Sequence, residues 1–296
     1  MTSYTEQKRQ KTSNVRLGIF FMILTTFTFA VQDSFSRLLA SEYNVILIVA
    51  IRYFVFAIFI VVASFREPQK FKRALKTKHP LLQISRGILL VAEVCIMVFS
   101  FTILGLAKSH AFFSCYPLMV CLLSIPILNE KIGFFRAIIV LFGLLGTLII
   151  LRPGTADFSV EYLIPLTSAL LFAIYSILTR YVSEEDNAET SLFWVGIVGA
   201  LFMLLLVPFH WEPIIGLDLL WTLILCFIAI LGHFFLIKTL EVCEASKVQP
   251  FAFFQIIFAS FFGVLLFSET LDLFSIIGTL LIIVSGILMY RYESKE

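Results

Sequence analysis

The chain has 296 residues, of which 60% are hydrophobic and only 14% are charged. Soluble domains carry about 25% charged residues, so this composition excludes a soluble globular protein and indicates an integral membrane protein. The formal net charge of +2 at pH 7 gives no indication of a nucleic-acid partner.

Ten apolar runs are each long enough to cross a bilayer as a helix, which takes about 20 residues. They lack the period-two alternation of a membrane β-barrel, so they predict helices. In chain order they cover roughly residues 17–40, 44–65, 80–104, 107–128, 132–150, 160–182, 190–208, 217–240, 246–267 and 272–290. The predicted fold is therefore all-α, a polytopic membrane protein with ten transmembrane helices.

Part of this pattern occurs twice. Three charged residues recur 139 positions later: Lys108, Glu130 and Arg152 return as Lys247, Glu269 and Arg291. Charged residues are scarce here, so their shared offset indicates a duplication better than shared Leu or Phe. Ala30 and Arg37 give a weaker echo of Ala173 and Arg180, at an offset of 143. Two copies in one membrane chain are typical of secondary transporters, with the substrate site between the copies.

The duplication predicts four parts: an N-terminal tail (1–16), a first five-helix repeat (17–152), a second five-helix repeat (153–291) and a C-terminal tail (292–296). Five crossings per copy place the copies in opposite orientations. Basic residues gather in the segments that would face the cytoplasm if the N-terminus does, which predicts both termini inside. The main clusters are Lys8, Arg9, Lys11 and Arg16, then Arg66, Lys70, Lys72, Arg73, Lys76 and Lys78.

Motifs for nucleotide hydrolysis, metal binding or covalent catalysis do not occur. The sequence has no GxxxxGK[ST], GxSxG or HExxH pattern, so an enzyme or an ATP-driven pump is not expected. The five cysteines stand in apolar runs without CxxC or Cys/His spacing, which favours packing over metal binding. We expect no metal and no cofactor.

Three charged residues fall well inside predicted helices, where ionisable groups cost at least about 2.5 kcal/mol. Glu93 lies about thirteen residues into the third run. It could carry a proton or contact a cationic substrate group, or be a hydrogen-bonded structural carboxyl. Asp33 and Arg52 lie at similar depth in the first two runs, which predicts an ion pair acting as a structural link, a gate or a substrate contact.

Other polar residues are further candidates for substrate binding or coupling. Arg86 lies seven residues before Glu93 and so on nearly the same helix face, where it could clamp an anion or instead extend to the inner interface. His233 is a candidate proton site or a packing histidine. Gln255 either links helices or orients a ligand.

Three aromatic residues, Tyr116, Tyr175 and Phe254, fall at depths that could line a central cavity, although core packing is the favoured explanation for each of them. Pro117 and Pro250 interrupt backbone hydrogen bonding in the fourth and ninth runs and so predict bends there.

Several segments resemble the drug/metabolite transporter superfamily, in its branch with two EamA domains. They are the run FSFTILGLAKSHAFFSCYPLMVCLLSIPILNEKI, the run GLLGTLIILRPG, and LEVCEASKVQPFAFFQIIFASFFGVLLFSETL in the second copy. The first two helices, with Asp33 and Arg52, are similar as well. The resemblance spans essentially the whole chain and implies inverted repeats, a bacterial inner-membrane location and transport of small metabolites without ATP.

The function expected from these features is secondary transport of a small amphipathic metabolite by alternating access, such as an amino acid or a drug-like molecule. Export driven by protons or exchange is the first expectation, and uptake of a metabolite such as S-adenosylmethionine or riboflavin is the alternative. A lipid flippase or accessory membrane subunit is an alternative of another class. Expected partners are the substrate and membrane lipid, with the chain a monomer or homodimer.

Overall fold

The computed structural model describes residues 14–66, 68–130, 133–151, 160–268 and 273–293. Within these ranges all regular elements are helices. Two markers of the sequence duplication, Arg152 and Glu269, lie outside the described residues, as do the basic residues before position 14.

The helices follow the apolar runs because a chain inside a bilayer can satisfy its backbone polar groups only within itself. The first copy contains α2 (Val15–Ala40), α3 (Val45–Arg66), α4 (Pro68–Leu75), α5 (Pro80–Leu104), α6 (Leu106–Phe113), α7 (Tyr116–Leu128) and α8 (Phe134–Leu151). The second contains η1 (Val160–Tyr162), α9 (Leu163–Val182), α10 (Ala188–Leu206), η2 (Val207–Phe209), α11 (Leu217–Val242), α12 (Ala245–Ala252), α13 (Phe254–Phe267) and α14 (Leu273–Glu293).

In the described chain, 8 helical stretches are long and apolar enough to cross a membrane. They coincide with eight of the ten predicted runs. The fifth and tenth runs correspond to shorter apolar stretches, Phe134–Gly146 in α8 and Ile276–Leu288 in α14.

The fourth and ninth predicted runs are each broken into two helices. The α6 helix gives way to α7 at Ser114 and Cys115, and α12 gives way to α13 at Phe253. Pro117 lies in the first turn of α7 and Pro250 lies within α12. A proline has no N–H to donate, so it interrupts the helical ladder at these places.

The helix after each break ends in the same turn. Asn129, after α7, has φ of 53°, and Ser268, after α13, has φ of 54°. The backbone N–H of Asn129 donates to the carbonyl of Ser124, and that of Ser268 donates to the carbonyl of Gly263. Both pairs are separated by the same 139 positions as the repeated charged residues. The backbone geometry therefore supports the duplication independently of the side chains.

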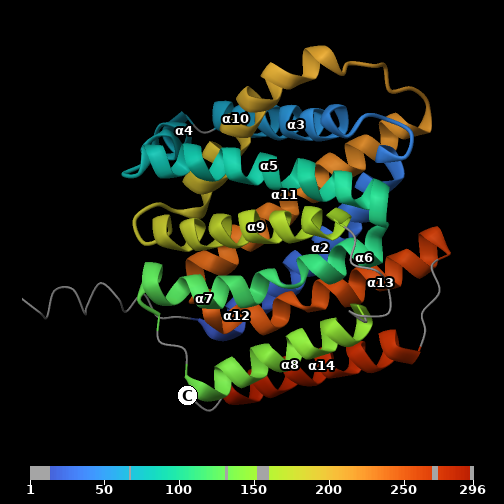
Figure 1. Cartoon of the computed structure of the whole chain (residues 1–296). Coiled ribbons are helices and arrows are strands. Elements are labelled where there is room, and N and C mark those ends of the chain that lie inside the picture. The colour runs from blue at the N-terminus through green and yellow to red at the C-terminus, as the bar shows by residue number, and fades with distance from the viewer. Residues whose placement is uncertain (1–13, 67, 131–132, 152–159, 269–272, 294–296) are drawn as a thin grey trace, which may run out of the picture.

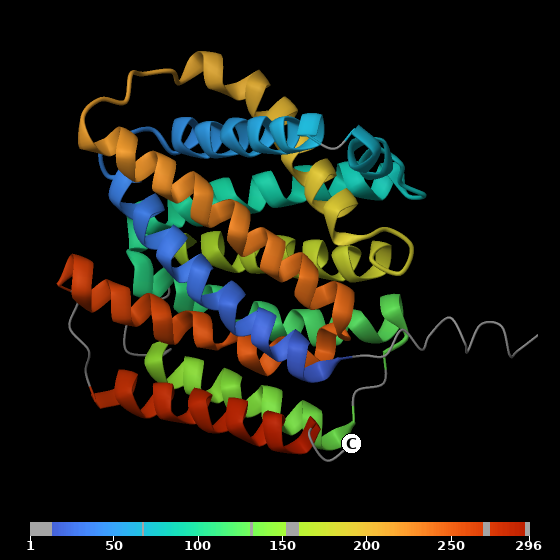
Figure 2. The same cartoon turned by 180° about the vertical axis from the view of Figure 1, so that it is seen from behind.

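Helices pack mainly between the copies. The α2 helix packs against α11 and α13 of the second copy, and α9 packs in the corresponding way against α5 and α7 of the first (Figures 1 and 2). The pairs α3 with α10 and α8 with α14 complete the pattern. In Figure 1, α2 and α5 begin at the left-hand end of the molecule, whereas α9 and α11 begin at the right-hand end.

Glycines let α8 and α14 approach closely. A Cβ atom on Gly146 would lie 2.7 Å from the carbonyl oxygen of Gly278. Beside this contact, Ser285 Oγ donates a hydrogen bond of 2.8 Å to the carbonyl oxygen of Ile139. The small residues of these helices thus serve packing between the copies.

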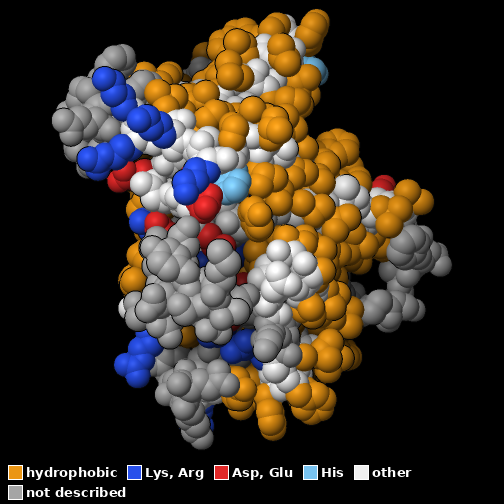
Figure 3. Space-filling model, turned by 90° about the vertical axis from the view of Figure 1, so that its left-hand side faces the viewer, with side chains coloured by type: hydrophobic (Ala, Val, Ile, Leu, Met, Phe, Trp, Pro, Cys, Tyr) orange, Lys and Arg blue, Asp and Glu red, His pale blue; other side chains and the backbone are white. Residues whose placement is uncertain are grey.

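Much of the surface is hydrophobic, with exposed side chains that include Phe20, Ile58, Phe134, Leu219 and Leu265. Charged side chains gather over part of the end at which α4 and α5 begin (Figure 3). The α2 helix begins and α14 ends at this same end (Figures 1 and 2). This distribution suits a protein whose sides face lipid and whose ends face water.

Candidate functional site

A small cavity lies among α2, α3, α5, α6, α9, α11 and α13. It is lined by Phe29, Gln32, Asp33, Arg52, Glu93, Val94, Met97, Val98, His110, Phe113, Phe172, His233 and Gln255. It offers about 30 Å³ to the centres of water-sized molecules, which is room for about two waters. The surrounding helices must therefore separate before a metabolite can enter.

The structure brings together five of the residues selected from the sequence, Asp33, Arg52, Glu93, His233 and Gln255, on the wall of this cavity. Both copies contribute, because His233 and Gln255 belong to the second copy and the other three belong to the first. All five are buried.

The Asp33 carboxylate accepts hydrogen bonds from two amides and has a histidine beside it. Gln32 Nε2 lies 3.1 Å from Oδ1, Gln255 Nε2 lies 3.4 Å from Oδ2, and His110 Nε2 lies 3.1 Å from Oδ2. An ionised carboxylate only accepts hydrogen bonds, so each amide turns its NH₂ group toward Asp33 and its oxygen away. Those two amide oxygens have no hydrogen-bond partner among the described residues.

Arg52 contacts a histidine of the other copy. Its Nη2 lies 2.7 Å from His233 Nε2. Arginine only donates, so His233 Nε2 accepts and the ring proton sits on Nδ1. Arg52 Nη1 and His233 Nδ1 have no partner among the described residues. The predicted pairing of Asp33 with Arg52 is thus replaced in this structure by a separate partner for each residue.

Glu93 connects the copies at the cavity wall. It is 5% exposed, and Ser168 Oγ on α9 donates a hydrogen bond of 2.8 Å to its Oε1. The cost of a buried carboxyl is lowered by such a partner. Glu93 therefore combines access to the cavity with a contact between α5 and α9.

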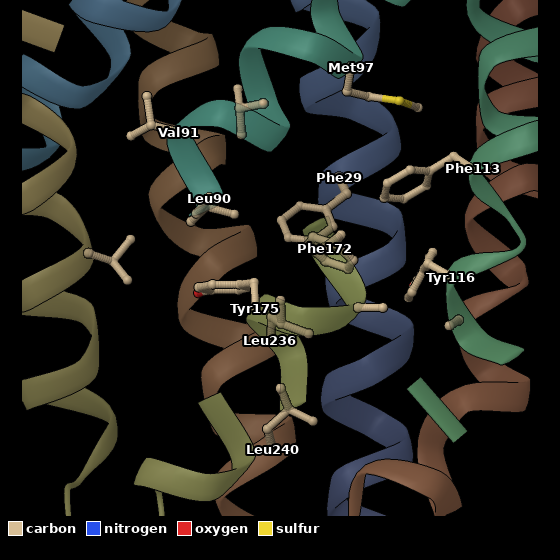
Figure 4. Close-up of a cluster of buried hydrophobic side chains, with 14 of the residues drawn as sticks. Phe29, Leu90, Val91, Met97, Phe113, Tyr116, Phe172, Tyr175, Leu236 and Leu240 are labelled. Atoms are coloured by element: carbon tan, nitrogen blue, oxygen red, sulfur yellow. The ribbon is translucent and has the colours of Figure 1, made fainter. Parts of the chain in front are cut away.

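Aromatic rings belong to the cavity wall and continue beyond it, because Phe29, Phe113 and Phe172 line the cavity and pack in one cluster with Tyr116 and Tyr175 (Figure 4). The rings of Phe113 and Phe172 lie 5.4 Å apart, centroid to centroid. Tyr116 packs edge-on against Phe172 at 4.9 Å, and Tyr175 lies 6.0 Å from the same ring. Both tyrosines pack against Phe172, which lines the cavity, whereas neither tyrosine lines it.

Arg86 lies outside the cavity, in a buried network between α5 and α9. Its side chain is 0% exposed, so it does not extend to the protein surface. Its Nε donates to Thr179 Oγ1 at 3.0 Å and its Nη1 donates to Gln83 Oε1. Gln83 Nε2 in turn donates to Asp186 Oδ2 at 2.8 Å. This series of hydrogen bonds connects Arg86 through Gln83 to Asp186, which follows α9.

Phe254 also lies away from the cavity. Its ring stacks on Phe251 at 6.3 Å and fills the space left by Gly286, where a Cβ atom would come within 2.7 Å of it. Its position supports packing of α13 against α14.

Three polar contributors were not selected from the sequence: Gln32, His110 and Ser168. Gln32 carried a usable signal, since an amide next to Asp33 in an apolar run needs a partner. The cavity phenylalanines carried none, because nothing distinguishes them among the 33 in the chain.

A polar cavity enclosed by two interlocked copies of a helical membrane unit is the architecture of a membrane transporter. Residues 16–152 and 159–291 each match the EamA-like transporter family. The chain belongs to the EamA-like transporter family and is a multi-pass membrane transporter, not an enzyme.

Named relatives extend over nearly the whole chain. An S-adenosylmethionine uptake transporter of Rickettsia prowazekii (strain Madrid E) is 24% identical over 283 residues, covering 94% of each protein. A riboflavin transporter of Vibrio cholerae is also 24% identical over 283 residues, with 94% of each protein covered. A solved crystal structure shares the fold with a TM-score of 0.73 and 18% identity, covering 95% of this chain and 99% of that one.

Proposed function

We propose that this chain is a secondary transporter that takes up a small charged metabolite across the bacterial inner membrane. The observation that carries the proposal is the buried cavity, in which the first copy places side chains of opposite charge and the second copy adds His233 and Gln255. Relatives named for S-adenosylmethionine uptake and for riboflavin transport support a small-molecule substrate, and the first of these names supports uptake over export.

The proposed topology has ten membrane helices in two inverted repeats, with both termini in the cytoplasm. The break of each 23-residue stretch, Leu106–Leu128 and Ala245–Phe267, into two half-helices supports it, since half-helices are a common feature of inverted-repeat transporters. The exposed lysines of the α4–α5 region, Lys72, Lys76 and Lys78, support a cytoplasmic position for that end of the molecule.

Glu93 is the proposed coupling group. A carboxyl that faces the cavity and contacts Ser168 can change protonation as the two copies move relative to each other. Asp33 and Arg52 complete the charged lining, His233 contacts Arg52, and all three belong to the same proposed binding site.

The experiment that tests the function follows metabolites in bacteria that express the native chain or an empty vector. Labelled S-adenosylmethionine and labelled riboflavin are supplied separately, and all small metabolites inside and outside the cells are compared by mass spectrometry. Accumulation of a compound only with the native chain identifies the substrate. Depletion inside with enrichment outside would reverse the direction, and no difference for any metabolite would overturn the function.

Glu93→Gln should remove coupling while preserving the shape of the site. We expect uptake by the native chain to change with external pH and uptake by Glu93→Gln to lose that dependence, with a rate lowered at least about tenfold. Glu184→Gln, at an exposed position, is the matched control and should behave as the native chain. Native pH dependence in Glu93→Gln would remove Glu93 from this role.

A further inference from the structure

The cavity contains buried polar atoms that its own side chains leave without partners. Among the described residues these are Gln32 Oε1, Gln255 Oε1, Arg52 Nη1, His233 Nδ1 and His110 Nε2, the last of which stands 3.1 Å from Asp33 Oδ2. The five residues are between 1% and 5% exposed. A buried donor or acceptor without a partner costs about 1–3 kcal/mol, so these atoms indicate the groups that a ligand has to supply.

Two of these atoms, Arg52 Nη1 and His233 Nδ1, carry hydrogens to donate. Arg52 is held at Nη2 by His233 Nε2, which leaves Nη1 of a permanently charged guanidinium free to donate. Arginine matches carboxylates closely in shape and charge. The ligand group that suits Arg52 is therefore a carboxylate, with His233 as the residue that positions the guanidinium.

Two others, Gln32 Oε1 and Gln255 Oε1, are acceptors. Gln32 and Gln255 give their NH₂ groups to Asp33, which fixes their oxygens as acceptors. Glu93 adds a carboxyl to the same cavity wall. An ammonium group has three N–H donors and no acceptor, so it fits these oxygens.

We infer that the site recognises an α-amino-acid head group, with the carboxylate of the substrate on Arg52 and its ammonium group on the Gln32 and Gln255 oxygens beside Asp33. The inference rests on the proposed function and narrows its substrate class. The rings of Phe29, Phe113 and Phe172 then face the remainder of the substrate, which favours an amino acid that carries an aromatic or cationic side group. S-adenosylmethionine fits this description, whereas riboflavin has no such head group.

The test uses the purified full-length protein in lipid nanodiscs and matched pairs of compounds. Each α-amino-acid compound, S-adenosylmethionine and the aromatic amino acids among them, is paired with its decarboxylated amine. Binding is measured by calorimetry, with riboflavin as a separate probe. For at least one pair, we expect the native protein to bind the amino acid at least about tenfold more tightly than the amine, as loss of a charge-assisted contact predicts.

The variant Arg52→Met should bind both members of that pair within about twofold of each other. Arg180→Met removes an arginine that lies outside the cavity and bonds to the Leu240 carbonyl, and it should keep the native preference. If Arg52→Met does not fold, the ratio measured on the native protein still decides, and Gln255→Met tests the other end by losing the preference for a free over an N-acetylated amine.

Three results overturn the inference: equal binding of acid and amine for every pair, an unchanged preference in Arg52→Met, or binding of riboflavin alone. The last result leaves the transporter function intact. Failure of the proposed function is recognised separately, because no metabolite would then be moved by cells that express the chain.

Discussion

The two copies are joined by side chains at the ends of helices, in addition to the side chains in the cavity. Glu130 follows α7 in the first copy, yet its carboxylate accepts backbone N–H groups at the start of α12 in the second. The bonds run from Ala245 N to Oε1 and from Ser246 N to Oε2, both at 3.0 Å. Arg180 Nε approaches the same carboxylate at 4.0 Å. A negative group at a helix N-terminus is favoured by the unpaired N–H groups and the helix dipole.

Glu130→Ala is expected to lower the free energy of unfolding by about 1–2 kcal/mol, because two backbone donors of α12 lose their partner. Thermal unfolding in detergent, followed by intrinsic fluorescence, measures the change. Glu184→Ala, at an exposed site, provides the comparison and should shift stability by no more than about 0.5 kcal/mol. Equal stability of the two variants would contradict a capping role.

The sequence could mark Glu130 as special but could not assign its partner. Its repetition at an offset of 139 was visible, whereas the bond to α12 joins residues 115 and 116 positions apart. The same limit applied to Asp33 and Arg52. Their depth in the membrane followed from helix length, but the choice of His110 and His233 as neighbours depends on tertiary packing, which periodicity does not encode.

At the scale of elements, the pairing of α8 with α14 depends on the absence of side chains. The backbone of Gly278 fills the place where a side chain of Gly146 would stand. Close approach of this kind lets dispersion and weak polar contacts accumulate between membrane helices.

Gly146→Val is expected to lower the free energy of unfolding by about 1–3 kcal/mol, since backbone atoms cannot yield as the end of a flexible side chain can. Gly133→Ala is a suitable control, because its added Cβ would lie 3.7 Å from the Tyr292 hydroxyl, an ordinary contact. Thermal unfolding in the same detergent compares the two. A native-like melting temperature for Gly146→Val would show that the helix pair can separate without cost.

Elements were more predictable than their junctions. Eight predicted runs coincide with apolar helices of sufficient length, because a long run of apolar residues has one stable form in lipid. The prolines indicated breaks, but the exact change from α12 to α13 at Phe253 depends on packing against α8, where Phe253 occupies the space beside Gly143.

At the scale of the whole molecule, the duplicated fold places equivalent residues against each other. Phe29 and Phe172 stand 143 positions apart in the sequence, the offset of the weaker repeat signal, and their rings lie 6.2 Å apart at the cavity. Near the centre of the molecule, equivalent residues of the two copies are therefore in contact. A movement of one copy displaces the contacting residue of the other copy directly.

The internal partners of Asp33 and Arg52 have a consequence for the transport cycle. In some carriers the substrate is the only partner of the buried binding charges. When the substrate leaves, the unpaired charges cost several kcal/mol, and the empty carrier cannot return across the membrane. Such a carrier can only exchange one substrate molecule for another. Here His110 and His233 remain beside those charges. We therefore expect the empty carrier to return across the membrane and to support net accumulation. In proteoliposomes, initial uptake of the labelled substrate should differ by less than about twofold between vesicles loaded with unlabelled substrate and vesicles without it; uptake only into preloaded vesicles would show a strict one-for-one exchanger instead.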